Sequence, residues 1–149
     1  IMQQALTLDP TNDRVRLELA RLLAHLRRID EAEQVLNAAS AEARESAHAT
    51  ALRAQFEFAR IAASARDPAA LEQAIATNPK DSAARYQLAA LLVLGNHHRE
   101  ALDQLLEIVR TDRKFQDDAA RKAMISVFNL LGGGELVNEY RRKLSMALN

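Results

Sequence analysis

Apolar residues recur at intervals of three and four along most of the chain. Between residues 13 and 26 they are Val15, Leu19, Leu22, Leu23 and Leu26, a spacing that places them on one face of an α-helix. Comparable segments follow at about 31–39, 46–65, 68–77, on either side of the polar break 95–100, up to 131, and at 135–148. No segment alternates apolar and polar residues as a half-buried strand would. We therefore predict an all-α fold of about eight helices after a partial leading one.

The segment 78–112 is the best-formed unit, with two helical patterns joined by that polar break. It resembles one tetratricopeptide repeat, a helix-turn-helix of about 34 residues. The resemblance rests on Leu88, Ala89, Leu92, Ala101, Leu105 and Ile108. Arg85 stands where the repeat usually has an aromatic residue, so the copy is degenerate. Pro10 and Pro79 are 69 positions apart, close to two repeats.

This period divides the chain into repeats at 13–45, 46–79, 80–113 and 114–148, within a single domain spanning 1–149. Residues 1–10 are interpreted as the tail of a truncated repeat, because the chain begins inside a helical pattern. We accordingly expect a piece of a longer protein. The repeats should form a short right-handed superhelix, closed by a C-terminal capping helix.

The charge balance and the cysteine content narrow the function. Lysine plus arginine and aspartate plus glutamate each number 20, so the net charge is zero and no overall field attracts nucleic acid or an anionic membrane. No apolar run approaches the length of a membrane span. The chain has no cysteine, which removes disulfides and thiol chemistry from it. We expect neither nucleic acid nor membrane as a partner.

No set of residues in the chain has the pattern of a catalytic or metal site. His97 and His98 lie in a turn without a partner at metal-ligand spacing. The glycines 132–134 have a helix before them and Glu135 after them, whereas a phosphate-binding loop needs a strand before it and a lysine after it. They are interpreted as a flexible connector. We predict no enzymatic activity and no cofactor.

The first helices of such repeats line a concave groove, and the register selects its residues. They are Arg14, Leu17, Arg21 and His25, then Leu52, Phe56 and Arg60, then Tyr86, Ala90 and Leu94. Leu17, Leu52 and Tyr86 occupy equivalent positions. This predicts an apolar groove with an arginine fringe, suited to apolar segments of a protein partner. Packing against neighbouring helices is the alternative interpretation of the same residues.

The sequence also resembles a more specific family, most strongly from residue 67 onward. The matching pieces are Asn78-Pro79-x-Asp81, Gln87-Leu88-Ala89, the block from Glu100, Ala120-Arg121-Lys122 and Tyr140-Arg141-Arg142-x-Leu144, with residues 28–36 before them. In these the chain is similar to the C-terminal half of YbbN/CnoX-type thioredoxin-like co-chaperones, the chaperedoxins.

That resemblance implies a bacterial cytoplasmic protein with a thioredoxin-like domain preceding this one. Proteins of the family hold unfolded clients under oxidative stress and pass them to the chaperonin and Hsp70 systems. The resemblance further implies that the last helix docks on the chaperonin. The residues carried over to this role are Leu136, Tyr140, Arg141, Leu144 and Leu148. A capping helix that closes the last repeat is the alternative for the same helix.

Two other functions stay open from the sequence. The chain would be the substrate-contacting domain of a thiol-disulfide oxidoreductase if the preceding domain carries a cysteine pair. Alternatively it is a scaffold or oligomerisation domain, forming a homodimer through an exposed repeat end.

Overall fold

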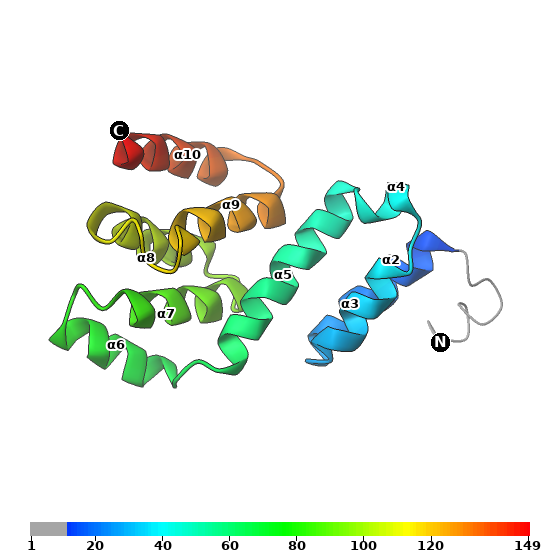
Figure 1. The fold of residues 1–149 in the computed structure, drawn as a ribbon, viewed down its shortest axis with the longest axis horizontal. Helices are drawn as coiled ribbons and strands as arrows, with labels where there is room; N and C mark the ends of the chain where they lie inside the picture. Colours follow the sequence, from blue (N-terminus) through cyan, green and yellow to red (C-terminus); the bar gives the residue numbers. More distant parts are fainter. Residues whose placement is uncertain (1–11) are drawn as a thin grey trace.

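The computed structural model describes residues 12–149, and within that range it is entirely helical (Figure 1). The expected all-α, tetratricopeptide-like fold is confirmed. The predicted tail at 1–10 lies outside the described residues. The nine helices of residues 12–149 are α2 (Asp13–His25), α3 (Ile29–Asn37), α4 (Ala41–Arg44), α5 (Ala47–Ala63), α6 (Pro68–Thr77), α7 (Ser82–Leu94), α8 (His98–Thr111), α9 (Ala119–Leu131) and α10 (Glu135–Leu148).

The hairpins α2–α3 and α7–α8 share one turn geometry, 69 positions apart. Arg27 (φ 63°) and Asn96 (φ 64°) are left-handed, and in each turn the following amide donates to a carbonyl five residues earlier. The pairs are Arg28 to Leu23 at 2.9 Å and His97 to Leu92 at 2.8 Å. This bond pattern is a Schellman motif, which ends a helix while satisfying its last carbonyls. The repeat period read from the sequence is thus present in the backbone.

Helix α5 runs between the two halves of the molecule (Figure 1) and contributes to a separate core in each. Its first half contributes Ala49, Leu52 and Phe56 to a core formed with α2 and α3. Its second half contributes Phe58 and Ala62 to a larger core with α7, α8, α9 and α10. Ser46 caps the helix by accepting a hydrogen bond from the Ala49 amide. Because one continuous helix serves both cores, α5 fixes how the two halves of the molecule meet.

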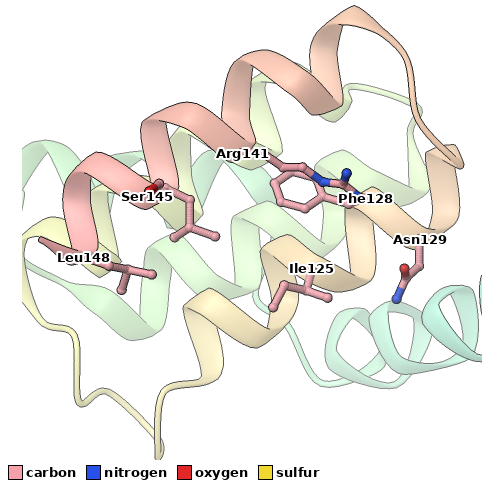
Figure 2. A pocket seen from close by; sticks show the side chains of 7 residues that line it. Ile125, Phe128, Asn129, Arg141, Ser145 and Leu148 are labelled. Atoms are coloured by element: carbon pink, nitrogen blue, oxygen red, sulfur yellow. The ribbon is translucent and has the colours of Figure 1, made fainter.

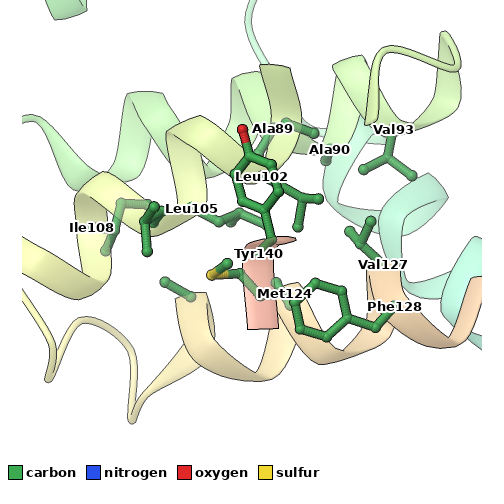
Figure 3. Packing of buried hydrophobic residues seen from close by; sticks show 14 of the residues in the cluster. Ala89, Ala90, Val93, Leu102, Leu105, Ile108, Met124, Val127, Phe128 and Tyr140 are labelled. Carbon is green, nitrogen blue, oxygen red and sulfur yellow. The ribbon is translucent and has the colours of Figure 1, made fainter. Parts of the chain in front are cut away.

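The larger core is centred on α8 (Figure 3). Leu102, Leu105 and Ile108 of α8 are fully buried, and Met124 and Val127 of α9 pack against the same core. Val137, Tyr140 and Leu144 of α10 complete it, so the last helix does cap the array. Helix α10 packs mainly on α8 and only slightly on α9.

Polar contacts reinforce the docking of α10 on α8. The Tyr140 hydroxyl donates to the carboxylate of Asp103. Arg99 of α8 pairs with Glu139 at 2.9 Å, and Lys143 also reaches Glu139 at 2.9 Å. The two cations lower the pKa of Glu139 to about 2. Burial, together with the neighbouring Asp103 carboxylate, raises the pKa of Tyr140 to about 12.

The structure departs from the expected elements in two places. The one-turn helix α4 was not expected; Ser40 caps it by accepting from the Ala43 amide. Asp117 and Asp118 precede the helical pattern that ends at 131, where acids usually cap a helix with their side chains. Instead both are left-handed (φ 58° and 67°), and Asp118 has no side-chain capping bond. Asp118 pairs with Arg121 one turn later, so its charge still favours the helix start.

Candidate protein-interaction surfaces

The link between α9 and α10 separates the two helices instead of closing them into a tight hairpin. Gly132, Gly133 and Gly134 have φ values of 81°, 143° and 102°. Side-chain-bearing residues rarely adopt these angles, so the three glycines permit a path that directs α10 onto α8. The expected connector role fits this position. A groove remains open between α9 and α10 on the side away from α8 (Figure 2).

Apolar side chains from both helices form this α9–α10 groove, which encloses about 290 Å³. Phe128 of α9 and Leu144 of α10 are buried in its floor. Ile125, which is 39% exposed, and Leu148 rise on opposite walls. Figure 2 shows the side chains of Ile125, Phe128 and Leu148 in the space between the two helices. An apolar concavity between helices is a common protein-binding feature.

One cation lies over the floor of the α9–α10 groove. The Arg141 guanidinium carbon is 5.6 Å from the Phe128 ring centroid, within cation–π range. Asn129 and Ser145 supply the other polar groups of the lining. Within residues 12–149, Arg141 forms no ion pair with a carboxylate. The groove therefore presents the Arg141 guanidinium as a hydrogen-bond donor whose positive charge no carboxylate in residues 12–149 balances.

The groove continues at both ends. Leu148 is shared with a hollow of about 430 Å³ that Arg113, Lys114 and Arg121 also line. Phe128, Asn129 and Arg141 are shared with a hollow of about 360 Å³ that reaches α5. The three hollows are therefore neighbours along α9, and together they are called the trough.

A second concavity, the α2–α7 cleft, lies where the two halves of the molecule face each other. It encloses about 300 Å³ and is lined by His25, Gln55, Val93, Leu94, Asn96, His98, Leu130 and Leu131. Leu22, one turn before His25 on the same helical face, is 41% exposed, and Leu26 is 58% exposed. Leu22 and Leu26 were expected on the inner face of their helix, but α3 and α5 cover only its other apolar residues. The end of α2 therefore adds apolar surface beside the cleft.

Two histidines, His25 and His98, line the α2–α7 cleft. No group of three or more metal-ligating side chains occurs among the described residues. Burial, and secondarily the neighbouring His97, lowers the pKa of His98 below its usual value. This lower pKa favours the neutral imidazole, which forms part of the cleft wall.

The residues predicted to line a concave groove separate into two groups. Leu17, Leu52 and Phe56 are buried in the core of α2, α3 and α5, so their side chains offer no surface to a partner. This corrects the expected apolar strip, because the neighbouring helices cover it. Phe56 is only 1% exposed. For these three residues the packing alternative describes what the structure contains.

Ala90 is likewise buried, at 1% exposure, and the remaining predicted groove residues lie at or near the surface. Arg14 and Arg21 are exposed, and Arg60 pairs with Asp30 at 3.1 Å and Glu33 at 2.8 Å. Tyr86 is half-buried against Phe115 in an edge-to-face contact with centroids 5.6 Å apart. Leu94 lines the α2–α7 cleft. The predicted set therefore does not converge on one site.

The residues predicted on the last helix divide between core and groove. Arg141, Leu144 and Leu148 line the α9–α10 groove. Tyr140 is 1% exposed and points into the core, and Leu136 is half-buried against the same core. Ile125 on the facing wall and Phe128 in the floor were not among the predicted site residues. Phe128 has the helical spacing of a core residue, and no sequence signal showed that α10 would leave one edge of α9 open.

The comparison with protein families agrees with the helical hairpins α2–α3 and α7–α8. A tetratricopeptide repeat model matches residues 61–149, more than half of the chain, and a second matches residues 1–56. The chain belongs to the tetratricopeptide repeat family. A search of curated proteins finds no match. Repeats of this kind are in general non-catalytic modules that bind other proteins. Among residues 12–149, no helix combines the length and apolarity that crossing a bilayer requires.

Proposed function

We propose that this chain is the protein-binding domain of a co-chaperone of the chaperedoxin type, and that it holds apolar segments of unfolded proteins. The α2–α7 cleft supports this proposal. It places Leu94, Leu130 and Leu131 opposite the end of α2, where Leu22 and Leu26 are exposed. Clustered exposed apolar residues beside a concavity are typical of interaction surfaces. An unfolded protein supplies the matching apolar segments.

The experiment is suppression of aggregation of a chemically denatured model enzyme, followed by light scattering after dilution. The wild-type chain should slow aggregation in proportion to its concentration. The double variant Leu22→Ser, Leu26→Ser should lose most of this effect, because it removes exposed apolar surface without opening a core. Met146→Ser is the matched control: Met146 is 76% exposed but lies on α10, outside the cleft. An inactive wild type, or a fully active double variant, would refute the proposal.

The resemblance also favours binding of the last helix to a chaperonin. The outward face of α10 carries exposed Arg142 and Met146. Removing the helix would be a poor test, because Val137 and Tyr140 belong to the core. The variant Arg142→Glu, Met146→Ser preserves that core. Chaperonin binding measured by co-sedimentation should fall in this variant, and unchanged binding would argue against docking through this face.

A further inference from the structure

The trough along α9 carries an excess of positive charge around an apolar centre. Two of its acids have a cationic partner within the described residues: Asp118 pairs with Arg121, and Asp117 pairs with Lys122 at 3.7 Å. Three cations of the lining form no ion pair within residues 12–149: Arg113, Lys114 and Arg141. Among the acids of the lining, Glu45 alone forms none there. Arg113 donates to the Ala147 carbonyl at 2.6 Å. The trough therefore complements an acidic ligand.

The shape of the α9–α10 groove points to a helix as that ligand. Its walls are two helices, and α9 has 13 residues, so the trough extends for about 20 Å. A third helix placed between two others buries one apolar face in the groove that they form. Ile125, Phe128, Leu144 and Leu148 provide that apolar contact. The open groove is thus the place where one more helix would continue the stacking of the array.

Arg141 indicates which charged group the bound helix must carry. Its guanidinium is held over the Phe128 ring, where an incoming carboxylate would meet it without a large change in the arginine side chain. The Asn129 amide and the Ser145 hydroxyl lie in the same lining and can donate further hydrogen bonds. Hydrogen bonds between ionised partners are roughly twice as strong as neutral ones.

We propose that the α9–α10 groove binds a helical segment of another protein, whose apolar face carries an aspartate or glutamate that pairs with Arg141. This groove is a site separate from the α2–α7 cleft, and the assignment does not depend on client binding there. It names the partner by its chemistry: apolar side chains at helical spacing and a carboxylate between them.

The test uses three fluorescein-labelled helical peptides of about 20 residues, long enough to populate a helix. They share leucines at helical spacing and differ at one central position, which is glutamate, glutamine or lysine. Binding is measured by fluorescence anisotropy. The glutamate peptide should bind most tightly, the glutamine peptide about tenfold more weakly, and the lysine peptide most weakly. Added salt should reduce the preference for glutamate.

Matched variants locate the binding site. Arg141→Gln should abolish the difference between the glutamate and glutamine peptides, whereas Arg142→Gln, its exposed neighbour outside the groove, should preserve it. Ile125→Ser should weaken all three peptides. Leu22→Ser, Leu26→Ser should leave peptide binding intact, which distinguishes a failure of this assignment from a failure of the client-binding proposal. Far-UV circular dichroism checks that each variant is folded.

Several results would overturn the assignment. These are no saturable binding at millimolar peptide, equal affinity for the glutamate and glutamine peptides, or equal effects of Arg141→Gln and Arg142→Gln. A second copy of the chain is the competing occupant. Concentration-dependent dimers in light scattering that Ile125→Ser dissociates would show that the groove serves self-association instead.

Discussion

Truncation of Tyr140 should destabilise the protein strongly, because the docking of α10 on α8 depends on this side chain. Tyr140 is 1% exposed and is among the largest fully buried side chains. A buried aromatic residue removes on the order of 150–250 Å² from water, worth about 4–6 kcal/mol as an upper estimate. Aromatic-to-alanine changes in cores cost about 3–5 kcal/mol. Tyr140→Ala should thus cost about 4 kcal/mol, a large share of a typical domain's stability.

The hydroxyl contributes much less than the ring. Tyr140→Phe keeps the ring and removes the bond to Asp103, whose carboxylate is exposed and returns to water. The expected loss is about 1 kcal/mol. Urea unfolding followed by circular dichroism measures both variants, and Met146→Ala, at a 76% exposed position of the same helix, should stay within about 0.5 kcal/mol of wild type. If Tyr140→Ala loses under about 1.5 kcal/mol, α10 is not held on α8 as described.

Two further predictions concern the turns and acid stability. Arg27→Gly should raise the free energy of unfolding by about 0.5–1 kcal/mol, because glycine relieves the left-handed backbone but costs unfolded-chain entropy. Asn96→Gly should gain less stability, since asparagine tolerates this conformation. A loss of stability in Arg27→Gly, measured by urea unfolding, would contradict this explanation. The pKa of Glu139 is about 2 in the folded protein against a usual 4.5, so its contribution to folding stability is present above pH 4.5 and disappears as the pH falls toward 2. The melting temperature of Glu139→Gln should therefore fall less than that of wild type between pH 5 and pH 2.5. Parallel decreases of the two melting temperatures would show that the ion pairs do not contribute.

The regular part of the fold was predictable because it follows from local chemistry. The 69-residue period between Pro10 and Pro79 reappears as matched turns at Arg27 and Asn96. Helical spacing of apolar residues and capping residues such as Ser46 also act within one or two turns of chain. Repeats with short connections therefore reveal their hairpins in the sequence.

The surfaces were less predictable because they depend on which helix covers which face. Periodicity identified Leu52 and Phe56 as one apolar stripe of α5, but not that α2 and α3 would bury it. The same reasoning assigned Leu22 to an inner face, whereas it is exposed.

The α9–α10 groove likewise follows from long-range packing. Gly132–Gly134 indicated a connector, yet the groove exists because Tyr140 packs toward α8. Its far wall, with Ile125, becomes a surface only once α10 is in place. Such features depend on contacts between segments distant in the sequence, which the pattern of a single helix does not contain.

The most direct test of a protein-binding groove in this repeat domain is a titration of isotope-labelled protein with the glutamate-bearing peptide, followed by amide chemical shifts. The largest changes should fall on α9 and α10, at Ile125, Phe128, Arg141 and Leu148, and they should shrink in Arg141→Gln. Changes concentrated instead on α2 and α7, or no changes at saturating peptide, would contradict the assignment.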